Sequence, residues 1–282
     1  MQTLRHRAAR QPDIERARTT PSTFGTPFDV NWLGLWTLYL KEVQRFLKVV
    51  TQTVLAPIVT TLLFLAVFTL ALGRGDVRVG ELAFVEFLAP GLIMMAIIQN
   101  AFANTSSSIG IAKVQGNIVD YLMPPLSPGE LVTGVAMGGV TRGVLVGIVV
   151  WLTMIPFVGV QLAHAWLVPF YVLSASLTLA LLGLLTALWA DKFDQMAAVT
   201  NFVITPLSFL SGTFYSIERL PEGLWWVAHA NPFFYMIDGL RFALTGQTDG
   251  YVLFGLGFLL AVNVALWLFT LRLVRTGYNL RP

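Results

Sequence analysis

Long apolar segments alternate with short polar ones along most of the chain. A helix of about 20 predominantly apolar residues is long enough to cross a lipid bilayer. Residues 28–282 are therefore predicted to form one all-α integral membrane domain with six membrane-spanning helices. These helices are expected over residues 51–72, 84–102, 130–156, 167–190, 195–214 and 251–271.

The composition also favours a membrane protein. Of the 282 residues, 56% are apolar and 12% are charged, and the mean hydropathy is +0.71. A soluble domain carries about 25% charged residues, so this chain has too little polar surface for a water-soluble particle. Cysteine is absent, which excludes disulfides and thiol catalysis and says nothing about the compartment.

Two different segments precede the first predicted span. Residues 1–27 are rich in Arg, Thr and Pro without apolar periodicity, which predicts a disordered, basic cytoplasmic tail. Residues 30–48 predict an amphipathic helix lying in the membrane interface; the alternative is a cytoplasmic extension of the first span. The apolar face of this helix is expected to hold Trp32, Leu35, Trp36, Tyr39, Val43, Phe46 and Leu47, and the polar face Thr37, Lys41, Gln44, Arg45 and Lys48.

The placement of Lys and Arg predicts the orientation in the membrane. Cytoplasmic segments of membrane proteins carry an excess of Lys and Arg. With the N-terminus inside, the outer segments hold only Arg74, Arg78, Arg219 and Arg241, and the inner segments hold nearly all the others. We therefore expect a multi-pass protein of a bacterial inner membrane, with both termini cytoplasmic. The basic residues are a topology signal rather than a nucleic-acid site.

The chain lacks recognisable catalytic or nucleotide-binding motifs. None of its four lysines follows a glycine, so no Walker-type phosphate loop is present. The three histidines have no metal-ligand spacing, and no catalytic, cofactor-binding or metal residue is expected. Ion-coupled transporters need ionisable groups inside the membrane, but only Arg142 lies clearly within a predicted span. The energy for transport is therefore expected to come from a partner subunit.

One cytoplasmic loop predicts a partner-binding helix. Residues 117–123 form a short predicted helix bounded by Gly116 and by Pro124 and Pro125. Its apolar residues lie in a segment too short to span a membrane, which suits docking into a groove on a partner. The alternative is a capped loop that packs on its own membrane domain.

The third predicted span combines small residues with a cation. Gly139 and Gly143 belong to a series of glycines spaced four apart, which allows close helix packing. Packing within the protomer is favoured over a subunit interface. Arg142 lies about 20 Å along this helix. It either faces a polar cavity and contacts an anionic substrate, binds carbonyls of a neighbouring helix, or snorkels to the interface. These three residues are assigned to the substrate path or to helix packing.

A semi-apolar region follows the fifth predicted span. Pro221 and the pair Asn231 and Pro232 each predict a helix start. Two short amphipathic helices on the outer side would either gate an exit path or form an aromatic belt that seats the protein in the membrane. The gate candidates are Glu218, Pro221, Asn231, Pro232, Tyr235 and Asp238.

Three stretches together resemble a known family. They are Leu-Ala-Pro-Gly-Leu-Ile-Met-Met at 88–95, the loop 115–125, and the block from Ser-Gly-Thr-Phe-Tyr to Asn-Pro-Phe-Phe-Tyr-Met-Ile-Asp-Gly at 211–239. Residues 30–275 resemble the ABC-2 type permeases of ATP-binding-cassette exporters, in the branch that contains the nodulation lipooligosaccharide exporter permease. The motifs are specific for the family and not for the substrate.

The resemblance implies six spans per protomer, a permease dimer and two cytoplasmic ATPase subunits that bind ATP and Mg. Residues 30–48 would match the family's connecting helix, and residues 211–239 its extracellular re-entrant helices. The expected substrate is a glycolipid, a lipid-linked saccharide or a hydrophobic drug. The second protomer is expected to be an identical copy, and both protomers are expected to contact membrane lipids. The ATPase-coupling residues would be Gln115, Gly116, Asn117, Ile118, Asp120, Tyr121, Leu122, Met123, Pro124 and Pro125.

Three other functions are alternatives to this expectation. A secondary transporter would show inverted repeats and buried carboxylates. A membrane-embedded transferase would need a His or Asp/Glu cluster at one membrane face. A non-transporting membrane scaffold is compatible with the sequence.

Overall fold

The computed structural model describes residues 30–72, 78–159, 162–217 and 221–280. The predicted tail of residues 1–27 and the gate candidate Glu218 lie outside the described residues. Strand in the described part is limited to β1 (Arg78–Val79) and β2 (Leu82–Ala83), which pair antiparallel with Arg78 opposite Ala83. All other regular structure there is helical, as an all-α membrane domain requires.

Five helices in the described part are long and apolar enough to cross a membrane. They confirm the first four predicted spans and the last one; the second extends well beyond its predicted end, and the third and the last extend a few residues beyond theirs. The five are α2 (Val50–Leu72), α3 (Phe84–Val114), α5 (Pro128–Val158), α6 (Leu167–Trp189) and α11 (Val252–Thr276).

The fifth predicted span, 195–214, has a different form. Three consecutive helical pieces occupy this region: α7 (Phe193–Val199), the π-helix η2 (Thr200–Ile204) and α8 (Thr205–Leu210). The N–H of Thr205 bonds to the carbonyl of Thr200, five residues back. Pro206 has no N–H to continue the regular ladder, and local π adjustments are one way in which membrane helices satisfy the backbone groups that a proline frees. The total of six spans therefore stays a prediction.

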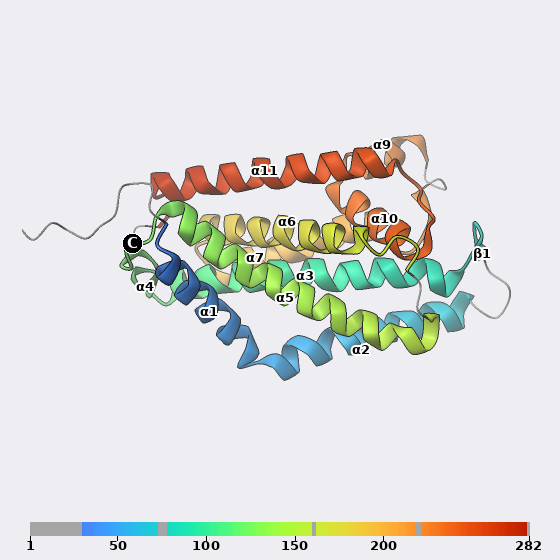
Figure 1. Ribbon diagram of the computed structural model, residues 1–282, viewed down its shortest axis with the longest axis horizontal. Helices are drawn as coiled ribbons and strands as arrows, with labels where there is room; N and C mark the ends of the chain where they lie inside the picture. Colours follow the sequence, from blue (N-terminus) through green and yellow to red (C-terminus); the bar gives the residue numbers. More distant parts are fainter. Residues whose placement is uncertain (1–29, 73–77, 160–161, 218–220, 281–282) are drawn as a thin grey trace, which may run out of the picture. The chain divides into compact units, whose positions relative to one another are not determined.

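The long helix α3 lies at the centre of the bundle (Figure 1). In its most apolar window 83% of the residues are buried, against 11% in α2 and 17% in α11. Figure 1 shows α11 along one side and α2 along the other, with α3 and α6 between them. The outer helices thus present apolar surfaces that are stable only against lipid or another protein.

Close packing of α3, α5 and α6 depends on small residues. A Cβ added at Gly183 of α6 would lie 2.5 Å from the carbonyl oxygen of Phe102 in α3. Beside it, Thr105 donates a hydrogen bond to the carbonyl of Ala180, at 2.7 Å. Gly139 and Gly143 of α5 face α3 and α6 of the same chain, where an added Cβ would lie 2.8 Å from side-chain atoms of α6. This geometry places the predicted small-residue series within the protomer.

Replacing Gly183 with alanine is expected to destabilise the protein by about 2–3 kcal/mol, because the new methyl group must push α3 and α6 apart. Thermal unfolding of the purified protein in detergent measures the change. Gly257→Ala in α11 is the matched control, since nothing lies within 4 Å of a Cβ there. That control should gain up to about 1 kcal/mol from helix propensity. Equal effects at both positions would contradict the packing argument.

The amphipathic segment is a helix of its own. Helix α1 (Trp32–Leu47) ends before α2 begins at Val50, and Figure 1 shows the two meeting at an angle. The alternative of one continuous extended first span is therefore wrong. The backbone N–H of Asn31 donates to Glu130 in the first turn of α5, at 2.5 Å. Glu130 also accepts from the N–H of Ser127 at 2.6 Å, so one carboxylate caps α5 and attaches α1 to it.

The two predicted helices after the fifth span are present. Helix α9 (Glu222–Ala230) begins after Pro221, and α10 (Pro232–Thr245) is capped by Asn231, whose side chain accepts from the N–H of Phe233. Both starts agree with the prediction, because proline favours the first positions of a helix. In Figure 1 they lie at the end of the bundle opposite α4 (Val119–Leu122).

Candidate functional site

The short helix α4 covers only Val119–Leu122, so the predicted helix over 117–123 was too long. Gly116 has a left-handed backbone, with φ of 75°. The next residues form tight turns, in which the N–H of Asp120 bonds to the carbonyl of Asn117. Pro124 and Pro125 follow and offer no N–H for further helical bonds. Local turn geometry at both ends therefore leaves room for little more than one helical turn.

The two sides of α4 differ in exposure. Ile118 and Tyr121 are buried against the membrane domain. Val119 and Leu122 are each 45% exposed, and Met123 is 77% exposed. The loop is thus fastened by one side and presents an apolar surface on the other. Gln115, Gly116, Asn117, Asp120, Pro124 and Pro125 are also exposed.

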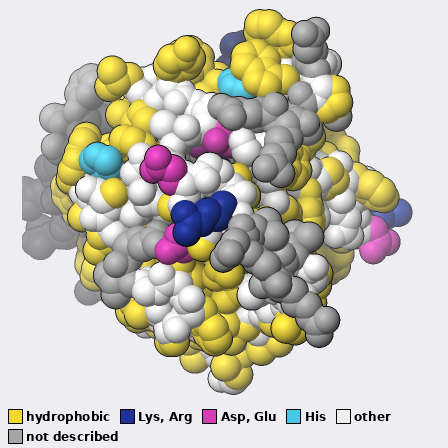
Figure 2. All heavy atoms as spheres, turned by 90° about the vertical axis from the view of Figure 1, so that its right-hand side faces the viewer, with side chains coloured by type: hydrophobic (Ala, Val, Ile, Leu, Met, Phe, Trp, Pro, Cys, Tyr) yellow, Lys and Arg dark blue, Asp and Glu magenta, His cyan; other side chains and the backbone are white. Residues whose placement is uncertain are grey.

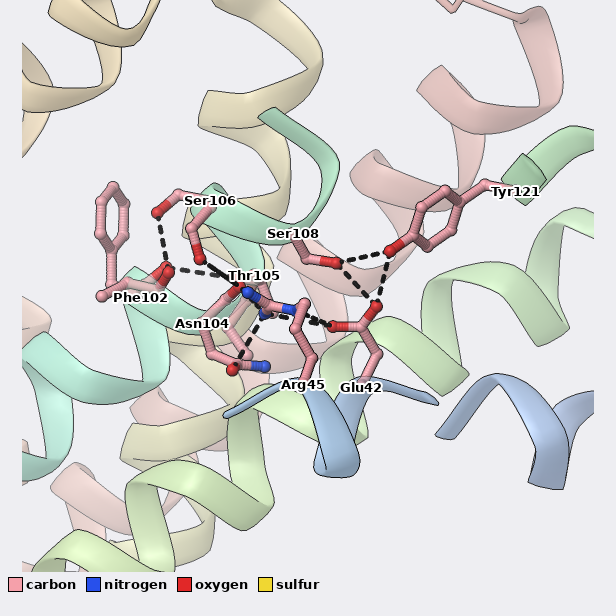
Figure 3. Close-up of polar contacts among 11 residues, drawn as sticks. Glu42, Arg45, Phe102, Asn104, Thr105, Ser106, Ser108 and Tyr121 are labelled. Atoms are coloured by element: carbon pink, nitrogen blue, oxygen red, sulfur yellow. Dashed lines mark hydrogen bonds and ion pairs between the residues drawn. The ribbon is translucent and has the colours of Figure 1, made fainter. Parts of the chain in front are cut away.

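A buried carboxylate, Glu42 of α1, holds the inner side of α4 (Figure 3). Its Oε1 accepts hydrogen bonds from Ser108 Oγ at 2.6 Å and from the hydroxyl of Tyr121 at 3.0 Å. Its Oε2 accepts from Nε and Nη2 of Arg45, both at 3.3 Å. Glu42 is fully buried, and it joins α1, α3 and α4 through three side chains. We call these four residues the Glu42 cluster.

Tyr121 is the member of the Glu42 cluster that belongs to α4. Burial, together with the charge of Glu42, raises the pKa of its phenol to about 12. The phenol therefore stays protonated throughout the physiological range and remains a donor to Glu42. The ammonium of Lys41 lies 3.7 Å from the centre of the Tyr121 ring, a cation–π contact that further fixes the ring.

Arg45, a residue of the predicted polar face, is half-buried and bonds to polar groups of α3. Its Nη2 donates to the backbone carbonyl of Asn104 at 2.6 Å, and its Nη1 donates to Ser107 Oγ at 3.1 Å. The periodicity of a single helix predicts such a polar face but does not reveal which neighbour it meets. Glu42 was missed altogether. The available signal was its place between Leu38 and Phe46, at four-residue spacing on the buried stripe of α1.

A polar cavity of about 850 Å³ lies beside the Glu42 cluster, between α2, α3, α5 and the η2 region. Arg45 belongs both to the cluster and to the cavity wall. Most of the polar wall comes from hydroxyl and amide side chains. These are Gln52, Thr53, Thr60, Thr61, Gln99, Asn100, Ser107, Thr200, Asn201 and Thr205.

Arg142 lines this cavity. Its Nε and Nη2 both donate to Oδ1 of Asn100 on α3, at 3.2 and 3.1 Å. The side-chain nitrogen of Asn100 in turn donates to the carbonyl of Ala96 at 3.0 Å. Of the three alternatives for Arg142, the structure places the side chain at a polar cavity, bound to a side-chain amide rather than to backbone carbonyls. Gly139 and Gly143 lie on the same helix and pack against α3 and α6.

The opposite end of the bundle contains a second buried charge pair. Arg241 of α10 is 1% exposed and lies 3.8 Å from Asp238. It donates to the carbonyl of Gly212 at 2.6 Å and stacks over the ring of Phe87 at 3.8 Å. Asp238 also accepts from the N–H of Asp249 at 2.8 Å. In the surface view of this end (Figure 2), other charged side chains lie near the centre among polar and backbone atoms, and hydrophobic side chains lie mainly toward the rim.

The other gate candidates take separate positions at this end. Asn231 donates to Ser211 Oγ at 2.7 Å and to the carbonyl of Leu207 at 3.0 Å. Tyr235 packs against the rings of Phe254 and Phe258 of α11. Pro221 and Pro232 lie at the helix starts. Asp238 and Asn231 are thus held in hydrogen-bonded positions, and Arg241, which holds Asp238, was not among the predicted site residues.

Long apolar helices around a polar cavity, with a fastened loop at one end, define a multi-span membrane protein of the transporter class. The sequence profile of the ABC-2 type transporter family matches residues 34–245. The chain belongs to the ABC-2 type transporter family, which confirms the resemblance seen in the sequence.

Two relatives extend this assignment over nearly the whole chain. The chain is 37% identical over 256 residues to the inner membrane transport permease YadH of Escherichia coli K12, covering 89% of this chain and 98% of the relative. It is 27% identical over 254 residues to nodulation protein J of Rhizobium leguminosarum bv. viciae, covering 87% and 94%. The family match over residues 34–245 includes most of α1, all of α4 and the helices around the cavity.

Proposed function

We propose that the chain is the permease subunit of an ABC exporter in a bacterial inner membrane. It moves an amphipathic substrate outward, a glycolipid, a lipid-linked saccharide or a hydrophobic drug, using ATP hydrolysed by a separate ATPase subunit. The name of the relative YadH supports the inner-membrane location, and membership of the ABC-2 type family supports an ATPase partner. Both termini are placed in the cytoplasm because Lys and Arg concentrate on that side.

The observation that carries the proposal is the two-sided loop around α4. Its exposed side offers Val119, Leu122 and Met123, an apolar patch suited to a groove on a partner. Its buried side is fastened to Glu42 through Tyr121, at 3.0 Å. A force applied to α4 therefore acts on the Glu42 cluster.

The Glu42 cluster also connects α4 to the cavity. Glu42 binds Arg45, and Arg45 lines the cavity wall. A shift of α4 driven by the ATPase would move Tyr121, then Glu42 and Arg45, and so change the cavity. The proposed complex holds two permease protomers, as a homodimer surrounded by lipid, and two ATPase subunits. ATP and Mg are bound by the ATPase, and this chain binds neither a cofactor nor nucleic acid.

Replacing Met123 with aspartate is expected to weaken association with the ATPase at least tenfold, since a carboxylate would be buried in an apolar contact. The chain is co-expressed with candidate ABC ATPase subunits, and the complex is quantified after purification. Tyr278→Asp, at a residue 47% exposed near the C-terminus, is the control and should leave the complex intact. Equal yields of complex for Met123→Asp and the unmodified chain would contradict docking through α4.

Coupling is tested by reconstitution in vesicles. The complex should move substrate only with ATP, and Tyr121→Phe combined with Asp120→Ala should lower the amount moved per ATP hydrolysed. Transport of substrate by this chain alone, driven by a proton gradient, would overturn the proposal.

A secondary transporter is the second candidate, because Glu42 is a fully buried carboxylate. Both of its oxygens already accept hydrogen bonds, one from Ser108 and Tyr121 and the other from Arg45, which argues against a role as a proton carrier. A transporter of that kind would lose gradient-driven movement in Glu42→Gln. A membrane scaffold would show no transport, either as the unmodified chain or as Glu42→Gln.

A further inference from the structure

We infer that the cavity between α2, α3 and α5 binds the anionic headgroup, a phosphate or a carboxylate, of an amphipathic molecule, with Arg142 as its cationic contact. The inference rests on the proposed transport function and names the chemical class of the substrate. It is carried by the charge balance of the cavity wall, by the free hydrogen-bonding capacity of Arg142, and by the mixture of polar and apolar surfaces around it.

The charges on the described part of the cavity wall are all positive. Arg45 and Arg142 are its only charged residues, and Asp, Glu, Lys and His are absent from the described lining. Arg45 is paired with Glu42, which lies behind the wall, at 3.3 Å. Arg142 forms no ion pair with any residue that the structure describes. Among the residues that the structure describes, the cavity therefore carries one uncompensated positive charge.

Arg142 also retains donors for a ligand. Two of its nitrogens share one acceptor, Oδ1 of Asn100, and Nη1 has no hydrogen-bond partner in the described part of the chain. A guanidinium presents its N–H groups in a planar fork that matches the oxygens of phosphate and carboxylate. A cation at membrane depth is unfavourable without a counter-charge. An anionic ligand would supply both the counter-charge and the missing acceptors.

The rest of the wall favours a molecule with a polar head and an apolar chain. Hydroxyl groups of Thr60 and Thr61 can bond a headgroup, while Phe64, Leu92 and Met95 contribute apolar surface to the same cavity. A volume of about 850 Å³ is at the upper end of the usual range of about 300–1,000 Å³ for ligand sites. It can hold a headgroup with part of a chain. A neutral sugar or a cationic drug would leave the charge of Arg142 uncompensated.

The test measures binding by the full-length chain in phosphatidylcholine nanodiscs, without ATP or ATPase. Two fluorescent probes share one acyl chain, and one ends in a phosphate monoester and the other in phosphocholine. The phosphate probe should bind at least tenfold more tightly. Arg142→Gln should remove most of this preference, and Arg142→Lys should keep part of it, because the charge remains without the fork. Arg275→Gln, an exposed position at the end of α11, should change nothing.

Gln99→Glu keeps Arg142 and places a competing carboxylate in the cavity wall. It should also weaken binding of the phosphate probe about tenfold. This variant replaces Arg142→Gln as the test if Arg142→Gln does not fold. Unchanged preference for the phosphate probe in a folded Arg142→Gln, or equal affinity of the unmodified chain for both probes, would overturn the inference. Displacement of the probe by millimolar inorganic phosphate would show a site for free anions and contradict the amphipathic ligand.

The two proposals fail in different ways. Because no ATPase is present, a negative binding result leaves the association and coupling tests untouched. Conversely, if the chain binds the phosphate probe but no ATPase, the inferred headgroup site is supported and the proposed exporter function is contradicted.

Discussion

Replacing Glu42 with alanine is expected to lower the free energy of unfolding by about 3 kcal/mol. Glu42 is fully buried and accepts hydrogen bonds from Ser108, Tyr121 and Arg45. Removing one partner of a buried charge pair costs about 3–5 kcal/mol. The lower end applies here because the Arg45 side chain is 29% exposed. Thermal or denaturant unfolding in detergent measures the loss.

The same variant should lose coupling between ATPase and transport, because α4 would no longer be attached to α1. Glu42→Gln keeps the shape and one acceptor oxygen, but turns an amide nitrogen toward either Arg45 or the two hydroxyls. An intermediate loss is therefore expected. Glu81→Ala, at an exposed residue between β1 and β2, is the control and should change stability by less than about 0.5 kcal/mol. If Glu42→Ala and the unmodified chain have the same free energy of unfolding, the Glu42 cluster does not hold α4.

Replacing Arg241 with alanine is expected to destabilise the protein by about 3–5 kcal/mol, since Asp238 would be left buried without its cation. Arg241 is 1% exposed, so water cannot take the place of the lost guanidinium. The carbonyl of Gly212 would also lose its donor. Unfolding in detergent again measures the change, with exposed Arg272→Ala in α11 as the matched control.

A second variant separates the ion pair from the loss of packing. Arg241→Ala combined with Asp238→Asn removes the unpaired charge, and part of the stability should return. A total loss equal to the sum of the two single losses would mean that the pair is not coupled. At this end of the bundle, the Asp238–Arg241 pair thus attaches α10 to the segment after α8 through the carbonyl of Gly212.

Local patterns were sufficient for most of the helices. Span lengths follow from the transfer of apolar side chains into lipid, which each segment carries in itself. The start of α10 at Asn231 and Pro232 follows from capping chemistry within a few residues. The fifth span shows the limit of local patterns. Pro206 predicts an interrupted hydrogen-bond ladder, but it does not indicate whether a break, a kink or a π-turn results.

The polar contacts of the site could not be predicted in this way. Glu42 meets Ser108 and Tyr121, which lie 66 and 79 residues further along the chain. For Arg142, the sequence leaves three alternatives open, because its partner Asn100 lies on the neighbouring helix, 42 residues away. Helical periodicity says which side chains share a face, but not which helix that face meets.

The sequence by itself determined the family, the all-α membrane architecture and nearly all of the long helices. These depend on apolar length, helix caps and a few motifs, which act over short distances along the chain. Only the tertiary structure decided that Glu42 fastens α4, that Arg45 turns inward and that Arg142 lines a cavity without a counter-charge among the described residues. Those outcomes depend on which helices touch, and close packing of three glycine-containing helices brings together side chains that are far apart in sequence.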